Sequence, residues 1–232
     1  MHRALVTGAN RGLGLVFVRQ LLARGDRVVA ACRHPGQARE LTQLACAHPG
    51  HLHVLPLDLL KPASIAELAR ETALVFEGLD LLVNNAGVLA GGERFGAVTA
   101  ETLLAGYQTN AAGPFLLVQA LAPLLAAAGT ARVLNIGSRM GSIGCADAFR
   151  SPSYALSKAA LGMATVQLAH ALRAQGTTVL LGNPGWARTD MGGGQAELDP
   201  EDSVRGLLRV LDAAEPGDSG RFFDWNGEEV PW

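Results

Sequence analysis

Short apolar runs alternate with longer segments of helical period along the chain, and this alternation restricts the possible folds more than any other feature. The runs are rich in Val and Leu, as expected of strands that helices cover on both faces. Alternation of this kind is typical of parallel βαβ units. We therefore predict an α/β fold: a doubly wound sheet of about seven mostly parallel strands with helices on both faces. The expected strands cover residues 3–7, 27–31, 52–56, 79–83, 132–136, 178–181 and 221–223.

The segments between these strands predict the helices, which we expect over residues 12–24, 61–76, 109–128, 152–175 and 200–211. Pro62 suits the first turn of its helix, and Gly176 suits the C-terminal cap of the long helix. No linker or repeat interrupts the chain of 232 residues. We therefore expect a single domain over residues 1–232.

Composition excludes several classes of partner. The net charge is −2 and no basic stripe is present, so we expect no nucleic-acid partner. The three cysteines are scattered and form no CxxC pair, so we expect neither a disulfide framework nor a metal site. The longest apolar stretches, such as residues 116–128, are too short to span a bilayer, and no signal peptide is recognisable. We therefore expect a cytoplasmic protein with no membrane partner.

A glycine-rich segment, VTGANRGLG, follows the first expected strand and opens the first expected helix. Glycines allow the backbone to turn sharply and to approach a pyrophosphate, while a helix N-terminus offers free N–H groups and a positive dipole end. An ordinary strand-to-helix turn is the alternative. The candidate cofactor-binding residues here are Gly8, Asn10, Arg11, Gly12, Leu13 and Gly14.

The tip of the second strand indicates which dinucleotide is preferred. Folds that prefer NAD place a carboxylate there for the ribose 2′-hydroxyl, but this chain has Arg33, and Asp26 lies at the wrong end of the strand. Arg33 and Arg11 together suit a 2′-phosphate by charge and by bidentate geometry. We therefore predict that NADP(H) is preferred and that NAD(H) remains possible. Two solvated surface arginines are the alternative.

Polar and small residues also follow the third and fourth strands. Asp58, followed by Leu59, can hold the adenine amino group of a dinucleotide. Asn84 is followed by Asn85, Ala86 and Gly87, whose small side chains leave room for a cofactor. The Asn amides can tie neighbouring strands together, although a simple turn would use the same residues.

The sharpest group comes later in the chain. Tyr154 and Lys158 are four residues apart in an expected helix, so both side chains lie on one face. A nearby ammonium favours the phenolate and lowers the pKa of a tyrosine toward the range useful in acid–base catalysis. An amphipathic helix with a packed Tyr and a surface Lys is the alternative. Ser138 follows the fifth strand, and Asn110, a poor helix former, lies in an expected helix.

In this order and over nearly the whole chain, these motifs resemble the short-chain dehydrogenase/reductase family, which has a single Rossmann domain. The resemblance implies that Tyr154 is the general acid in reduction and the base in oxidation. It implies that Lys158 lowers the pKa of this tyrosine and holds the nicotinamide ribose. Ser138 would polarise the substrate oxygen, and Asn110 would hold a water that links Lys158 to solvent. The segment expected to bind the nicotinamide carboxamide contains Pro184, Gly185, Trp186, Ala187 and Thr189.

Within that family, residues 138–143, 184–193, 219–224 and 230–232 resemble the C-factor and sniffer type of carbonyl reductase, a subgroup that suggests NADPH. Asn183 departs from the subgroup, which usually has His before the Pro-Gly pair. The separation between Ser138 and Tyr154 is longer than the common spacing, so Ser142 is a rival for the serine role. We prefer Ser138 because it lies at the strand tip.

We therefore predict an enzyme, an NADPH-dependent carbonyl reductase that moves a hydride between NADP(H) and a small carbonyl or alcohol substrate of unspecified identity. A dinucleotide-binding signalling or regulatory protein with little catalysis is one alternative, because fold alone does not exclude it. An NAD-linked alcohol dehydrogenase is another. The family resemblance implies a homodimer or homotetramer formed through helices that correspond to residues 103–128 and 152–175.

Overall fold

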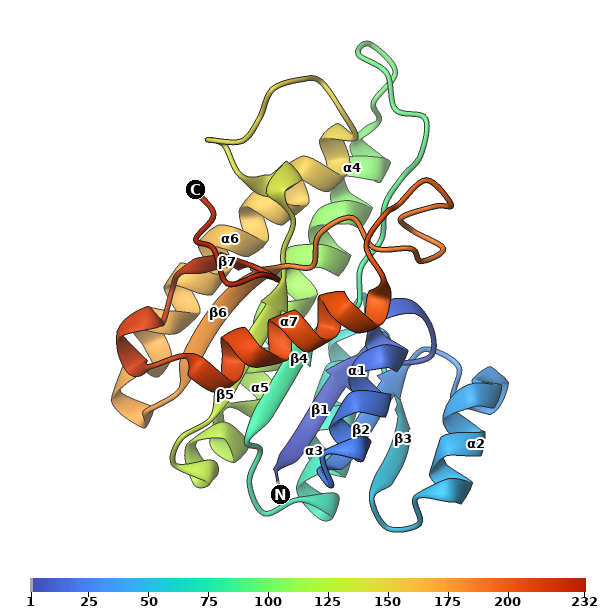
Figure 1. Cartoon of the computed structure of the whole chain (residues 1–232), viewed down its shortest axis with the longest axis vertical. Coiled ribbons are helices and arrows are strands. Elements are labelled where there is room, and N and C mark those ends of the chain that lie inside the picture. The colour runs from blue at the N-terminus through green and yellow to red at the C-terminus, as the bar shows by residue number, and fades with distance from the viewer. Residues whose placement is uncertain (1) are drawn as a thin grey trace.

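The sheet has seven strands in the order β3-β2-β1-β4-β5-β6-β7, and every neighbouring pair is parallel (Figure 1). This computed structural model describes residues 2–232. The predicted fold class is confirmed. The strands are β1 (Arg3–Thr7), β2 (Arg27–Cys32), β3 (Leu52–Pro56), β4 (Leu81–Asn84), β5 (Arg132–Ile136), β6 (Thr178–Asn183) and β7 (Phe222–Asp224).

Strand β4 begins two residues later than expected, because the Leu79 N–H leaves the ladder and donates to the Leu124 carbonyl over 2.8 Å. The helices are α1 (Gly12–Ala23), α2 (Arg39–Ala47), α3 (Pro62–Val75), α4 (Ala100–Tyr107), α5 (Gly113–Ala128), α6 (Pro152–Leu172) and α7 (Pro200–Ala213). Helix α2 is absent from the expectations, and it buries only Leu41. Gly176 caps the helical turn that follows α6, at φ +72°.

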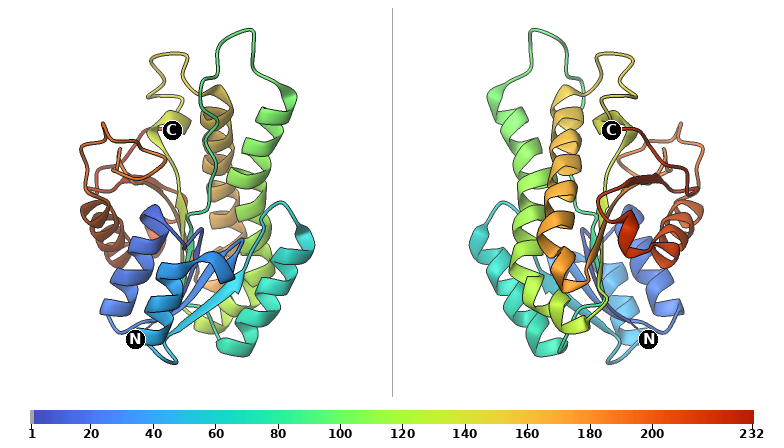
Figure 2. Two further views of the ribbon diagram at one scale, coloured as in Figure 1. Left: turned by 90° about the vertical axis from the view of Figure 1, so that its right-hand side faces the viewer. Right: turned by 90° about the vertical axis from the view of Figure 1, so that its left-hand side faces the viewer.

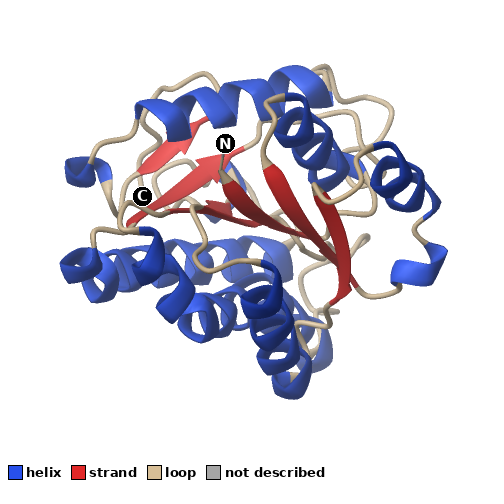
Figure 3. Ribbon diagram, turned by 90° about the horizontal axis from the view of Figure 1, so that it is seen from below, coloured by secondary structure: helices blue, strands red, loops and turns tan. Residues whose placement is uncertain are grey.

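Successive residues of each strand point to opposite faces of the sheet, and two apolar clusters result. In β1, Ala4 and Val6 pack with α1, α2 and α7, whereas Leu5 packs with α3, α5 and α6. All three side chains are fully buried. Figures 2 and 3 show the two helical layers with the sheet between them. Both faces are covered, which explains why the strands are apolar throughout instead of alternating with polar residues.

Helices α4 and α5 are continuous through a π-helical turn at Gln108–Ala112, whereas the sequence predicted one helix from residue 109. The combined stretch, Ala100–Ala128, has 29 residues and contains an 18-residue window with a mean hydropathy of 1.8, so it is long and apolar enough to cross a membrane by length and composition alone. Residues 116–128 by themselves therefore underestimate this helix. In the fold, Leu117, Leu121 and Leu125 are buried against the sheet, so the stretch forms part of one helical layer.

Three long segments lie at the carboxyl edge of the sheet: residues 85–99 after β4, residues 137–151 after β5 and residues 184–199 after β6 (Figure 1). Ligands of doubly wound sheets bind outside this edge, where the strand order reverses. Here the reversal lies between β1 and β4, so these segments and the β1–α1 turn surround the expected site.

Candidate active site

The glycine-rich turn after β1 is pressed against the end of β4. Gly8 has φ +62°, and a Cβ placed there would lie 2.8 Å from the Cα of Ala86. A Cβ at Gly14 would lie 2.3 Å from the Gly8 carbonyl oxygen. The Asn85 side chain donates to the Thr7 carbonyl over 2.8 Å and ties the two strand ends together. Only glycine fits these two close approaches, as the sequence argument expected of a turn that cradles a pyrophosphate.

A cavity of about 750 Å³ runs along this edge of the sheet and lies within the usual size range of small-molecule sites. It opens on the start of α1, whose first turn holds no acidic residue. Free N–H groups and an acid-free first turn fit the phosphates of a dinucleotide. Of the predicted residues, those that line the cavity are Gly8, Asn10, Arg11, Gly12, Leu13, Arg33, Asp58, Leu59, Asn85, Ala86, Gly87, Tyr154, Lys158, Pro184 and Thr189.

Part of the predicted carboxamide segment lies away from this cavity. Trp186 donates its indole N–H to the Gly192 carbonyl over 2.8 Å, and Ala187 pairs with Leu198 across the neck of the segment. A Cβ at Gly185 would lie 2.9 Å from the Trp225 ring. In this conformation these three residues close the segment on itself, and only Pro184 and Thr189 of the expected set face the cavity.

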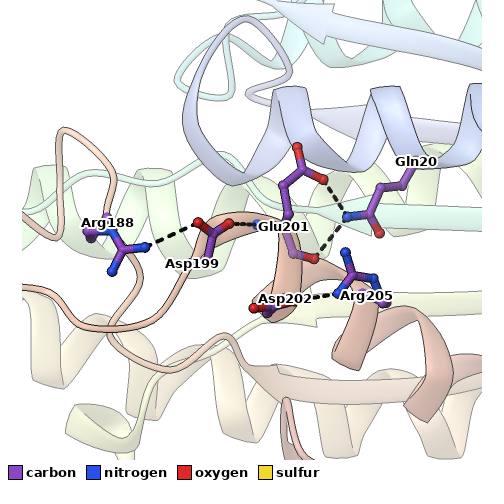
Figure 4. A network of polar contacts seen from close by, with 6 residues as sticks. All are labelled: Gln20, Arg188, Asp199, Glu201, Asp202 and Arg205. Carbon is purple, nitrogen blue, oxygen red and sulfur yellow. Dashed lines mark hydrogen bonds and ion pairs between the residues drawn. The ribbon is translucent and has the colours of Figure 1, made fainter.

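The base of residues 184–199 is fixed by polar contacts to its surroundings (Figure 4). Arg188 pairs with Asp199 at 3.1 Å, and Asp199 also caps α7 by accepting the Glu201 N–H over 2.9 Å. Gln20 of α1 donates to the Glu201 carbonyl over 2.9 Å and to its carboxylate over 2.7 Å. Helix α1 starts at the glycine-rich turn. These contacts therefore hold the glycine-rich turn and residues 184–199, which both line the cavity, in a fixed position relative to each other.

The two predicted phosphate-binding arginines have different surroundings. Arg11 pairs with Asp190 at 3.1 Å, and both side chains are largely exposed. Arg33 is exposed on the cavity wall, and within residues 2–232 it forms no ion pair. Arg33 can therefore take a phosphate without giving up a partner, whereas Arg11 has to exchange or share one.

Tyr154 and Lys158 lie in the first half of α6, and both side chains line the cavity as their spacing predicted. The Lys158 ammonium lies 5.5 Å from the centroid of the Tyr154 ring and donates to the Ile136 carbonyl over 2.6 Å. Burial lowers the pKa of Lys158 to about 8. Burial of an ammonium costs free energy. A ligand that places negative charge or polar oxygens beside Lys158 would offset this cost, so binding of such a ligand is favoured here.

The pKa of the Tyr154 phenol is raised, because burial outweighs the hydrogen bond with Ser138 that lowers it. We expected Lys158 to lower this pKa, and the direction found is the opposite. Ser142 is 2% exposed, and its hydroxyl donates to the Pro231 carbonyl over 2.5 Å. Ser138 is therefore the serine whose hydroxyl lowers the pKa of Tyr154, while the Ser142 hydroxyl bonds to the C-terminal segment.

Asn110 lies in the π-helical turn, and its side-chain amide is fully used. Its Oδ1 accepts the Val88 N–H over 2.8 Å, and its Nδ2 donates to the Val88 carbonyl and to Ser157 Oγ, each over 2.9 Å. A Cβ at Gly87 would lie 3.2 Å from the same Oδ1 and 3.8 Å from the Lys158 nitrogen. Asn110 therefore fixes the start of residues 88–99 beside Lys158, which explains a poor helix former in this helix.

Several residues that hold the site together are missing from the sequence predictions. A Cβ at Gly141 would lie 2.6 Å from the backbone of Lys158, so only glycine lets the Ser138 segment pack on α6. Arg139 pairs with Asp224 of β7 at 2.6 Å, and Asn183 donates to the same carboxylate over 3.1 Å. The departure at Asn183 therefore takes part in a buried contact under the Ser138 segment. No local motif indicates these partners, because they are distant in sequence.

The cavity also extends beyond the predicted residues toward its open end. The lining there is mostly apolar or small, and its residues are Val88, Leu89, Ala90, Thr102, Ala105, Gly106, Thr109, Ser153 and Met191. This part of the wall comes from residues 85–99, helix α4, the π-helical turn after it, the start of α6 and residues 184–199.

Comparison with known proteins agrees with this geometry. A family model described as short chain dehydrogenase matches residues 2–199. The NADPH-bound carbonyl reductase from chicken fatty liver is 38% identical with a TM-score of 0.95, and the match covers 100% of this chain and 99% of that one. The carbonyl reductase Sniffer of D. melanogaster is 33% identical with a TM-score of 0.96, and both chains are covered completely, at 100% each.

A third relative is the C-signal protein of Myxococcus xanthus, which is 43% identical over 154 residues, or 66% of this chain and 93% of that protein. The predicted resemblance, including the C-factor and sniffer type, is confirmed. The presence of NADPH in the chicken fatty liver structure agrees with the predicted cofactor. The chain belongs to the short-chain dehydrogenase/reductase family of oxidoreductases.

Proposed function

We propose that the protein reduces a small, uncharged carbonyl compound with NADPH, and that Tyr154 delivers the proton. The observation that carries this proposal is the placement of Tyr154. Its phenol lines the same cavity as the glycine-rich turn, Arg33 and Lys158. Burial raises its pKa, and a protonated phenol is the form that an acid needs in reduction.

The cofactor assignment rests on the glycine-rich turn and on Arg33. The turn fits a pyrophosphate, and the guanidinium at the tip of β2 is available to a 2′-phosphate. The structural relative from chicken fatty liver, which is 38% identical, binds NADPH. When bound, the dinucleotide supplies the hydride.

The chain's own residues then act on the oxygen of the substrate. Negative charge develops on that oxygen as hydride arrives at carbon, so donors aimed at it lower the barrier. Ser138 and Tyr154 are the donors, and Tyr154 completes the step by transferring its proton to the oxygen. Lys158 stabilises the resulting phenolate with its ammonium and holds the ribose of the cofactor. The role of Asn110 in holding a water for proton relay stays a prediction.

The open end of the cavity favours uncharged substrates. Its lining includes Val88, Leu89 and Met191, and Asp190, the acidic residue at this end, is paired with Arg11. A charged substrate would lose its hydration there without gaining a partner. We therefore place small apolar ketones and aldehydes ahead of keto acids.

We also propose that the protein forms a homodimer or homotetramer through α4, α5 and α6. Leu104, Tyr107, Leu116, Leu156 and Met163 on these helices are 41–61% exposed. Exposed large apolar residues on adjacent helices are typical of subunit interfaces. The cytoplasmic location stays a prediction.

Turnover of NADPH, followed at the nicotinamide absorbance band, tests the proposal with a panel of apolar ketones, aldehydes, dicarbonyls and keto acids. We expect oxidation of NADPH with the uncharged compounds. Tight binding of NADPH without turnover of any compound would favour the regulatory alternative. Equal or faster turnover with NADH would favour the NAD-linked alternative.

A further inference from the structure

Helix α6, which presents Tyr154, begins without a cap of its own. Its N-cap residue, Ser151, has φ +39° and makes no side-chain capping bond. A non-glycine residue in the left-handed region is strained, and such strain persists only where the surroundings impose it. The first N–H groups of any helix lack intrahelical acceptors, so another group has to satisfy them. Tyr154 is the third residue of this helix and lies within that first turn.

Glu93 provides the missing acceptor from a different part of the chain. One oxygen of its carboxylate accepts the Ser153 N–H over 3.3 Å and the Ser153 hydroxyl over 2.8 Å. The two residues are 60 positions apart in sequence. A carboxylate at a helix N-terminus is favoured by the helix dipole as well as by these hydrogen bonds. The second carboxylate oxygen is buried and has no hydrogen-bond partner within residues 2–232, so the side chain is held in place at some cost.

A second contact joins the same two segments. Phe95 and Phe149 pack edge to face with ring centroids 5.7 Å apart. Phe95 is 90% exposed, so this contact adds little to the core, but it is a second point at which residues 88–99 meet residues 142–151. At its other end, residues 88–99 start at Val88, which Asn110 holds through both its N–H and its carbonyl.

We propose that Glu93 is a positioning residue for Tyr154, because it caps α6 from residues 88–99, which begin in the cavity wall, and thereby couples the order of residues 88–99 to the placement of the phenol. This inference rests on the proposed role of Tyr154 as the acid. Ser153, which Glu93 holds, lines the cavity directly before Tyr154. Residues 88–99 thus line the open end of the cavity. Through the side chain of Glu93, they also hold the first turn of α6 in place.

This arrangement separates two kinds of effect. The glycine-rich turn and Arg33 belong to β1, α1 and β2, and none of them contacts Glu93 through a hydrogen bond. Loss of the cap therefore moves the phenol and loosens the substrate end of the cavity without changing the nucleotide end. Displacement of a catalytic group by about 1 Å can cost about 10²-fold in rate.

The test compares Glu93→Ala and Glu93→Gln with wild type, with Asp147→Ala as the control. Asp147 lies in the neighbouring segment 142–151, where it makes only an exposed ion pair with Arg150. We expect Glu93→Ala to lower kcat by about 10–100-fold and to raise KM, with the NADPH Kd within about twofold of wild type. Glu93→Gln should recover most of kcat, because the amide oxygen still accepts both hydrogen bonds. Asp147→Ala should match wild type.

Hydrogen exchange makes the inference testable without turnover. The Ser153 and Tyr154 amides should exchange faster in Glu93→Ala than in wild type, at a temperature where both are folded. If no carbonyl is turned over by wild type, the proposed function fails, and exchange alone still tests the cap. Wild-type kcat in Glu93→Ala, unchanged exchange at these two amides, or equal losses in the Ala and Gln variants would each overturn the inference.

Discussion

The nucleotide end and the substrate end of the cavity are built in different ways. At the nucleotide end, Gly8, Arg33 and Asp58 lie within two residues of the ends of β1, β2 and β3, so parallel strands bring them together. At the substrate end, long connecting segments pack against α4 and α6, and they are held by contacts such as Glu93 with Ser153 and Ser142 with Pro231. Substitutions at the first end should therefore change cofactor affinity, and substitutions at the second should change turnover.

We expect the largest effect on turnover from Tyr154→Phe, which removes one hydroxyl at the substrate end and keeps the ring. General acid catalysis contributes about 10²–10⁴-fold, so we expect kcat to fall by at least that range. The NADPH Kd should stay near the wild-type value, because the nucleotide end is untouched. Single-turnover reduction of a reactive dicarbonyl, with cofactor affinity measured by fluorescence, checks both. Wild-type turnover by this variant would return Tyr154 to the role of a packed aromatic residue.

Arg33→Ala tests the nucleotide end in the opposite sense. A charged hydrogen bond to phosphate is worth about 1.5–3 kcal/mol, so the preference for NADPH over NADH should narrow by about 10–100-fold. The kcat at saturating NADPH should change little. The matched control is Arg70→Ala on α3, where the arginine makes an exposed ion pair with Glu67. Equal binding of both cofactors by wild type would contradict the argument, as would an unchanged ratio in Arg33→Ala.

The same difference decides how much of the molecule could be predicted from its sequence. Residues at strand ends can be predicted, because apolar runs locate the strands and the fold class then brings their ends to one edge. Gly8, Arg33 and Asp58 all line the cavity as expected. Contacts between distant segments are not readable. Nothing near Glu93 in the sequence indicates that it lies against Ser153, because the separation depends on how α4 packs against α6.

The pKa of Tyr154 was predicted in the wrong direction for a related reason. The sequence places Lys158 four residues away, which gives the sign of one electrostatic contribution. Burial of the phenol gives the opposite sign and outweighs the rest. Burial depends on residues that close over the ring from other elements, so spacing alone does not supply it.

Lys158 lies between the two ends of the cavity, and its lowered pKa leads to a prediction for how the unfolding free energy depends on pH. Burial lowers its pKa to about 8 from the ordinary value of 10.5. Between these two pH values the unfolded chain binds more protons at this site than the folded chain, so the contribution of Lys158 to stability rises with pH there. Below pH 8 the cost of the buried charge is present in full. Relative to Lys158→Met, the unfolding free energy of the cofactor-free wild type should rise by at most about 1.4 kcal/mol per pH unit.

Urea unfolding of both proteins from pH 7 to 10, without cofactor, measures this difference. A parallel response of the two proteins across the window would show that Lys158 keeps its ordinary pKa. Hydrogen bonds from the ammonium to the cofactor ribose would raise the pKa of Lys158 again, so saturating NADPH should shift the rise to higher pH.

We expect the smallest effect from Asp190→Asn, which tests whether a residue of the substrate end alters cofactor affinity at the nucleotide end. Arg11 belongs to the glycine-rich turn and Asp190 to residues 184–199, and their ion pair spans the cavity. A cofactor 2′-phosphate that uses Arg11 competes with Asp190, so removal of the carboxylate should tighten NADPH binding and leave NADH binding unchanged. Exposed pairs are worth about 0.2–1 kcal/mol, which corresponds to about 1.4–5-fold in Kd.

A double-mutant cycle decides whether this gain passes through Arg11. In the Arg11→Ala background, Asp190→Asn should no longer alter the NADPH Kd, because the arginine for which the 2′-phosphate and Asp190 compete is absent. The gain in the single variant should shrink at high salt, where exposed charges are screened. A gain that persists in the Arg11→Ala background would mean that Asp190 repels the phosphate directly. Weaker NADPH binding in Asp190→Asn would mean that the ion pair supports the cofactor, so that the substrate end contributes to nucleotide binding.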